Sequence, residues 1–246
     1  MTVETQWKRI VDWCEANTPA TARALRPGSA PEVVDAAIEA TGVNWTGELR
    51  EFYLLNNGMQ RDDPETGAYA GSIFPMHDLI DLDEVLETRL RMRAVTQELL
   101  ASDPVVSPEQ GAEFIREYER QDAGSVAGWF LSSFIPFASR DGYMYFVDTR
   151  PGPRSGCVTG YAHSDADNRG PVWSNVAEML EIHADALTTG SPIRNFIPSA
   201  DDGVLKWHLI DDGRSTASAK PASSSYIPSP DDEKIKNEAR RRLLGR

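Results

Sequence analysis

Residues 134–161 read FIPFASRDGYMYFVDTRPGPRSGCVTGY, and this stretch decides the fold. Its centre, 143–147, holds only apolar and aromatic residues and lies between a glycine and an aspartate. A short apolar run between turn-forming residues is typical of a strand buried on both faces. The turns expected at 139–142 and 151–155 are short, and short connections favour antiparallel neighbours. We therefore expect a mainly antiparallel sheet with 143–147 as a central strand.

Outside this stretch, apolar residues recur at the spacing of amphipathic helices. In the helix expected from Ser174 to Gly190, the inward positions are Val176, Met179, Leu180, His183 and Leu187. Further helices are expected at 4–16, 31–41, 46–56, 78–101 and 109–121, and short strands at 72–76 and within 193–210. Helices come first, then strands, then a helix, which indicates an α+β fold with a central sheet flanked by helices.

Composition and charge limit the class of protein. The chain has 246 residues, 40% hydrophobic and 26% charged, which suits a large soluble domain with appendages. Its net charge is −13. That charge argues against nucleic acid and anionic membranes as partners, and it is compatible with a basic protein partner. The sequence does not indicate an oligomeric state.

The character of the chain changes after residue 190. We expect a main domain at 1–190 with a helical insert at about 83–128, and an extension at 191–212 that can pack on it. A Ser/Pro-rich linker is expected at 213–230 and a short charged helix at 231–246, so that the C-terminal extension is partly flexible. The last segment carries six basic and four acidic residues, a net charge of +2, which leaves −15 on the rest.

The sequence carries no recognisable catalytic or cofactor motif. Walker, dinucleotide-binding, nucleophile-elbow and zinc-protease patterns are absent, and the four histidines are too far apart for a local metal site. We therefore expect no enzyme activity, cofactor or metal. Cys14 and Cys157 are expected to be reduced core residues of a cytoplasmic protein, because two cysteines are too few for a disulfide framework and the N-terminus lacks a signal-peptide pattern.

Several short motifs occur in a recognisable order. They are Trp7-Lys-Arg-Ile-Val-Asp-Trp13, Leu25-Arg-Pro-Gly-Ser-Ala-Pro-Glu32, Gly47-Glu-Leu-Arg-Glu-Phe-Tyr53, Leu55-Asn-Asn-Gly58, Phe134-Ile-Pro-Phe-Ala138, Asp141-Gly-Tyr-Met-Tyr-Phe-Val-Asp148 and Gly156-Cys-Val158. This order resembles the SUKH superfamily of the Smi/Knr cell-wall-assembly-regulator type, over about residues 4–190.

The motif residues that carry the resemblance are expected to be structural. They are Trp7, Asn57, Gly58, Pro136, Gly142 and Asp148. Asn57 and Gly58 are expected to close a helix, and Pro136 to start an edge segment. Asp148, at a strand end, is expected to accept hydrogen bonds from backbone donors in a turn.

The resemblance implies a protein-binding module. The first hypothesis is an immunity protein that covers the basic active site of a cognate bacterial toxin, and the second is a regulatory or scaffold protein of a cellular assembly. A third, an enzyme or small-ligand domain, predicts a deep pocket with convergent polar groups. The candidate partner contacts are Asp62, Asp63 and Glu65, in a loop expected to be exposed, and Asp81, Asp83 and Glu84 beyond it.

Overall fold

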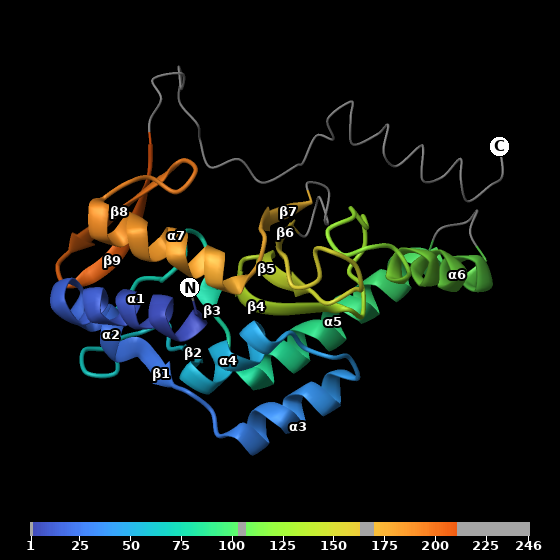
Figure 1. Cartoon of the computed structure of the whole chain (residues 1–246), viewed down its shortest axis with the longest axis horizontal. Coiled ribbons are helices and arrows are strands. Elements are labelled where there is room, and N and C mark those ends of the chain that lie inside the picture. The colour runs from blue at the N-terminus through green and yellow to red at the C-terminus, as the bar shows by residue number, and fades with distance from the viewer. Residues whose placement is uncertain (1, 103–106, 163–169, 211–246) are drawn as a thin grey trace.

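The computed structural model describes residues 2–102, 107–162 and 170–210. It is an α+β fold with antiparallel sheets and surrounding helices (Figure 1), which confirms the expected fold class. The predicted linker at 213–230 and the predicted helix at 231–246 lie outside the described residues.

A five-stranded antiparallel sheet forms the centre, in the order β3-β4-β5-β6-β7. Its strands are β3 (Asp78–Leu79), β4 (Phe134–Arg140), β5 (Tyr143–Asp148), β6 (Val158–Ala162) and β7 (Pro171–Trp173). The middle strand is β5, and all of its residues after Tyr143 are buried, as the apolar run predicted. Asp141 and Gly142 join β4 to β5 with φ of 50° and 84°. Positive φ at both residues is what a two-residue hairpin turn requires.

Two hydrophobic clusters lie on the two faces of this sheet. The larger one contains residues of α1 (Val3–Asn17), α4 (Gly47–Leu55) and α7 (Val176–Thr189), and α1 packs along both other helices. Trp7 of α1 meets Phe52 of α4 edge to face, with ring centroids 5.3 Å apart. The placement of α7, with its inward residues buried, agrees with the predicted helix, although Asn175 caps it rather than Ser174.

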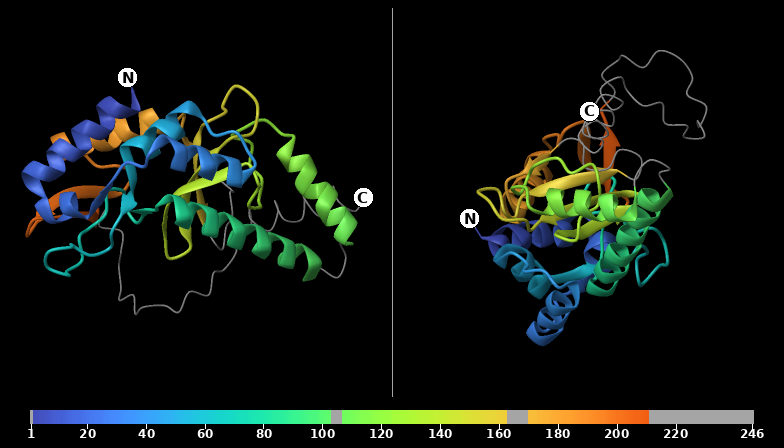
Figure 2. Two further views of the ribbon diagram at one scale, coloured as in Figure 1. Left: turned by 90° about the horizontal axis from the view of Figure 1, so that it is seen from below. Right: turned by 90° about the vertical axis from the view of Figure 1, so that its right-hand side faces the viewer.

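The smaller cluster lies under the segment between β3 and β4. α5 (Leu82–Ser102) and α6 (Pro108–Glu119) extend beyond the sheet, opposite the end of the molecule that holds α2 (Pro19–Ala24) (Figure 2). The phenylalanine side chains of this cluster, Phe130, Phe134 and Phe146, are fully buried, so they are core residues. The clusters therefore divide the aromatic residues between the two faces.

A buried ion pair ties the segment between β3 and β4 to the sheet. Asp148 and Arg150 have side chains 1% and 0% exposed, and an Arg150 nitrogen lies 2.7 Å from the Asp148 carboxylate. Arg150 also donates to the backbone oxygens of Tyr118 and Ser125 at 3.0 and 2.6 Å. The Asp148 carboxylate accepts the Gly124 and Arg150 N–H groups, so it takes backbone donors as predicted. Because both charges are buried, removal of one partner leaves the other uncompensated.

Two boundaries in the first half differ from prediction. The helix expected from Asp78 begins at Leu82, because Asp78 and Leu79 pair with β4 as β3. No strand forms over 72–76; this stretch holds isolated bridges and a turn. Apolar spacing cannot by itself distinguish a short strand from the first turn of a helix.

The Asn57-Gly58 pair does not close a helix in the left-handed conformation. α4 ends at Leu55, and the chain continues as β2 (Asn56–Met59), which pairs with β1 (Leu25–Pro27). Gly58 has φ of 82°, and a Cβ there would lie 2.7 Å from the Asp81 nitrogen. The Asn57 side chain accepts the Leu82 N–H at 3.0 Å, at the start of α5. Both residues therefore support the close packing of β2 against the start of α5.

Pro136 lies within β4 and pairs with β5, next to a β-bulge. It is not on an edge strand, but β3 covers only Ala138 and Ser139 on the other side of β4. No β3 residue therefore faces the missing N–H of Pro136, which explains why proline is tolerated there.

The C-terminal hairpin consists of β8 (Phe196–Asp201) and β9 (Val204–Leu209). It packs on α2 and α7, and the Leu205 N–H donates to the Thr21 hydroxyl at 2.9 Å. The Trp207 indole N–H donates to the Ser72 backbone oxygen at 3.0 Å. Residues 196–209 are therefore part of the folded body.

Candidate functional site

The six predicted contact carboxylates lie in two segments that flank β2. Asp62, Asp63 and Glu65 are in the loop that follows β2, and Asp81, Asp83 and Glu84 are at the start of α5. Two arginines from α2 and β1, Arg23 and Arg26, reach these segments. Both segments therefore lie next to the two-stranded sheet of β1 and β2, but the six carboxylates differ in their partners and in their exposure.

Asp63 is buried, contrary to its expected exposure in the loop. Its side chain is 1% exposed, and both carboxylate oxygens accept hydrogen bonds from Arg23, at 3.0 and 2.7 Å. The carboxylate also accepts the Glu65 N–H and the Thr66 hydroxyl. The Arg23 guanidinium and these donors hold the pKa of Asp63 well below its usual range. Asp63 therefore stabilises the loop as a buried hydrogen-bond acceptor. The sequence did not indicate this role, because its partner Arg23 lies in a distant segment.

Asp81 is also engaged internally. One of its carboxylate oxygens accepts from Arg26 at 2.5 Å, and the other accepts the Glu84 N–H at 2.9 Å. The Glu84 carboxylate in turn accepts the Asp81 N–H at 3.3 Å. This reciprocal pair satisfies two backbone donors at the N-terminus of α5.

Four exposed carboxylates remain, and we call them the acidic surface: Asp62, Glu65, Asp83 and Glu84. Glu65 lies 3.2 Å from Arg23, and Glu84 is part of the cap. Among the described residues, Asp62 and Asp83 have no side-chain hydrogen bond or ion pair. Both segments are visible from below the molecule (Figure 2, left). The local negative charge is thus smaller than the sequence suggests, because Arg23 and Arg26 offset two of the six carboxylates.

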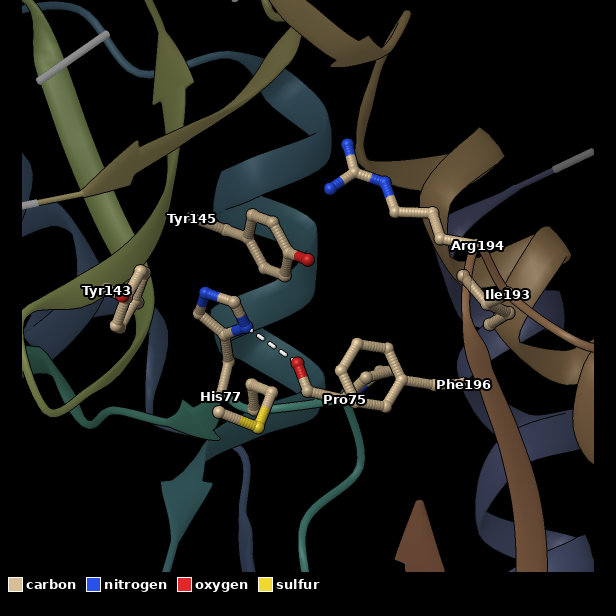
Figure 3. Close-up of a pocket in the computed structure, with 8 residues that line it drawn as sticks. Pro75, His77, Tyr143, Tyr145, Ile193, Arg194 and Phe196 are labelled. Atoms are coloured by element: carbon tan, nitrogen blue, oxygen red, sulfur yellow. Dashed lines mark hydrogen bonds between the residues drawn. The ribbon is translucent and has the colours of Figure 1, made fainter. Parts of the chain in front are cut away.

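A second feature, which the sequence did not predict, is a pocket of about 350 Å³. Its lining comes from the turn before β3, from β5 and from the segment between α7 and β8 (Figure 3). The lining residues are Pro75, Met76, His77, Tyr143, Tyr145, Ile193, Arg194 and Phe196. We call this the turn pocket. Its walls are mainly apolar and aromatic, which is typical of a ligand site.

Three polar groups face the turn pocket. The His77 ring stacks on Tyr145 with centroids 3.8 Å apart, and its Nδ1 lies 2.7 Å from the Pro75 carbonyl oxygen. Burial lowers the pKa of His77 to about 4, so the ring is neutral at pH 7 and Nδ1 carries the donated proton. Burial raises the pKa of Tyr145, which keeps its hydroxyl protonated. Arg194 supplies a positive charge on the opposite side (Figure 3).

Ser199, Asp201 and His208 on the β8–β9 hairpin are close together but do not form a catalytic relay. The Ser199 hydroxyl and the Asp201 carboxylate both contact Nε2 of His208, at 2.7 and 3.1 Å. In a catalytic triad the histidine uses one nitrogen for the nucleophile and the other for the acid. These three residues therefore form a partly exposed polar cluster across two strands.

The described residues contain no cluster of histidine, cysteine or carboxylate side chains suited to a metal ion. His183, whose position on the inner face of α7 the spacing predicted, is buried against Phe74 with ring centroids 4.6 Å apart. Burial lowers its pKa to about 4. Within the same described segments, no helix is long and apolar enough to span a membrane.

Comparison with known proteins identifies one family. The model of the SMI1 / KNR4 family (SUKH-1) matches residues 28–182, which include β2, α5, α6, the central sheet and the first half of α7. This confirms the resemblance seen in the sequence motifs. The family includes immunity proteins and cell-wall regulators, and it works through protein–protein contacts. No curated protein matches the chain.

Proposed function

This chain belongs to the SMI1 / KNR4 family (SUKH-1), and from that premise we propose that it is a non-catalytic protein-binding module of the cytoplasm. Its first proposed role is that of an immunity protein, which neutralises a cognate bacterial toxin by covering the toxin's active site. The family match over residues 28–182 carries this proposal, because that family works through protein–protein contacts.

The proposed mechanism is occlusion by a surface of opposite charge. A toxin that acts on nucleic acid needs a basic cleft, since its substrate is a polyanion. The whole chain carries a net charge of −13, so its long-range field attracts a basic partner. Complementary charge raises the association rate and disfavours wrong partners. Asp62 and Asp83 are the leading contacts, because their carboxylates are exposed and unpaired among the described residues.

Two ion pairs support this mechanism by fixing the shape of the acidic surface. Arg23 holds Asp63 through two hydrogen bonds, and Arg26 holds Asp81 through one. The loop and the start of α5 are thereby anchored to α2 and β1 before any partner arrives. A preorganised surface loses less conformational freedom on binding.

The test is affinity capture with matched charge reversals of the full chain. The double variant Asp62→Lys/Asp83→Lys changes the acidic surface. The control, Glu32→Lys/Glu39→Lys, makes the same charge change at exposed positions of α3 (Pro31–Thr41). We expect the first variant to lose the co-eluting partner and the second to retain it. Equal retention by both variants rejects the acidic surface as the contact.

A second candidate role is a regulatory or scaffold protein of a cell-envelope or signalling assembly. The observation in its favour is the arm of α5 and α6, which extends beyond the sheet and which a minimal inhibitor does not need (Figure 2). Expression of the captured partner alone separates the two roles. An immunity role predicts that the partner arrests growth and that co-expression of this chain restores it. A scaffold role predicts no arrest.

A further inference from the structure

Two tight turns face each other across the turn pocket. The first spans 74–77 and is closed by the His77 N–H on the Phe74 oxygen at 3.2 Å. The second spans 193–196, where Ile193 and Phe196 exchange both backbone hydrogen bonds, at 2.8 and 3.0 Å. Met76 lies in the first turn and Arg194 in the second, and both side chains line the pocket. The pocket is thus assembled from turns that are distant in sequence.

Both turns hold a large side chain in a backbone conformation that favours glycine. Met76 has φ of 62° and Arg194 has φ of 53°. The other described non-glycine residues with positive φ are Asp141 and Asp202, and each of these is an aspartate that precedes a glycine in a hairpin turn. Aspartate tolerates this region, whereas methionine and arginine are strained there. Strain of this kind is concentrated at functional sites, where the side chain is needed.

The charge of Arg194 in the pocket is exposed and is not neutralised by another described side chain. Among the described residues, Arg194 has no carboxylate within ion-pair distance, and its guanidinium carbon lies 5.9 Å from the centre of the Trp173 ring. The Tyr145 side chain lines the pocket, its hydroxyl has no hydrogen-bond partner among the same residues, and the charge of Arg194 acts to lower its pKa. A guanidinium and a phenolic O–H are both donors, and together they suit a carboxylate.

The apolar part of the pocket determines the chemistry and the size of the rest of the ligand. Met76 is 51% exposed and Tyr143 is 50% exposed, so both present apolar surface to solvent at the pocket mouth. Ile193 and Phe196 continue this wall on the opposite side (Figure 3). A volume of about 350 Å³ is enough for a group the size of one or two amino-acid residues.

We propose that the turn pocket binds a carboxylate attached to an apolar group, with Arg194 and Tyr145 holding the carboxylate and Met76 and Phe196 covering the apolar part. The C-terminal residue of a polypeptide and a free aromatic acid share this chemistry. The site is independent of the acidic surface. Ile193, Arg194 and Phe196 lie beyond the family match at 28–182, so the pocket belongs to the family domain plus its C-terminal hairpin.

The binding test uses the full chain and three probes in isothermal titration. They are an N-acetylated peptide ending in phenylalanine with a free carboxylate, the same peptide as a C-terminal amide, and N-acetylphenylalanine. We expect the free-acid peptide to bind with a Kd of about 1 mM or tighter, and the amide about tenfold more weakly. If N-acetylphenylalanine binds as tightly as the free-acid peptide, a free aromatic acid is sufficient as the ligand. If it binds more weakly, the ligand is the C-terminal end of a polypeptide. Absence of binding by both acids, or equal binding of acid and amide, overturns the proposal.

Variants separate the pocket from general effects of charge. Arg194→Gln is expected to weaken the free-acid peptide about tenfold, while Arg93→Gln, at an exposed position of α5, leaves it unchanged. Met76→Gly is expected to weaken binding and also to raise the urea midpoint, because glycine relieves the strain at φ 62°. A merely structural methionine would lower the midpoint instead. Unchanged peptide affinity in Arg194→Gln contradicts the assignment.

Discussion

The acidic surface and the turn pocket carry opposite charges, and they arise in opposite ways. The acidic surface comes from two short sequence segments, 62–65 and 81–84, but Arg23 and Arg26, from elsewhere in the chain, offset part of the charge of these segments. The turn pocket is assembled from three separate segments, and its cation is left without an internal partner among the described residues. The number of charged residues in a sequence segment therefore does not give the charge that the folded surface exposes. A charged surface can also form without any local sequence pattern.

The largest expected effect is a pH dependence of the free energy of unfolding, to which the turn pocket contributes and the anchoring Asp63 contributes little. His77 in the pocket and His183 on α7 have pKa values lowered to about 4, against about 6.5 in an unfolded chain. The unfolded state therefore binds more protons between pH 6.5 and 4, and stability falls as the pH is lowered through this window. Between pH 7 and pH 5 each histidine should contribute a loss of about 2 kcal/mol.

Urea unfolding at the two pH values measures this loss. The His77→Gln variant should lose about half of the pH dependence, because one titrating group is gone. Asp63, which anchors the loop of the acidic surface, contributes little in this range, because its lowered pKa means that its stabilising interactions are lost only when the pH falls below about 4. A free energy of unfolding that is the same at pH 7 and pH 5 would show that the histidines are not buried as described.

The next effect separates two neighbouring aspartates. Asp63→Ala removes four hydrogen-bond contacts of a buried carboxylate and leaves Arg23 without its main partner. We expect Tm to fall by about 5 °C or more, measured by circular dichroism. Asp62→Ala should shift Tm by less than about 2 °C, because its carboxylate is exposed. Similar shifts for both variants contradict the distinction between an anchoring and a contact residue.

A smaller effect of opposite sign is expected in the pocket. Met76→Gly should increase the free energy of unfolding by about 0.5–1 kcal/mol, since relief of the left-handed strain exceeds the added flexibility of glycine. The Met76 side chain is 51% exposed, so its loss removes little buried surface. Urea unfolding of the variant checks this, and a clear decrease would show that Met76 is a packing residue.

The smallest effects are expected at the outermost charges of the two regions. Arg194→Gln and Asp83→Ala should each change Tm by less than about 2 °C, because both side chains are exposed and neither has an ion pair among the described residues. Thermal scans of both variants test this. A loss of several degrees at either position would assign that residue to the fold and remove it from the proposed sites.

Much of the fold was predictable because its signals are local. The run 143–147 identified the central strand, and the spacing of Val176, Met179 and His183 identified the inner face of α7. The start of α5 was predicted too early, because the pairing of β3 with β4 depends on a segment far along the chain. Local patterns report what a segment can form, and tertiary pairing decides between the alternatives.

The candidate sites were less predictable for the same reason. Asp62 and Asp63 are indistinguishable in sequence, and only the position of Arg23 makes one of them internal. The sequence predicted a strand over 72–76 and not the turn that carries Pro75 and Met76, and nothing near them indicated Arg194 on the other side of the pocket. Sites that are assembled from distant turns need the three-dimensional arrangement to be recognised.

Hydrogen exchange of the full chain, alone and with its captured partner, tests the central proposal most directly. Binding through the acidic surface predicts slower amide exchange at 60–69 and in the first two turns of α5, with α6 unchanged. Protection confined to α6, or to the exposed side of α1, would place the partner elsewhere and contradict the account.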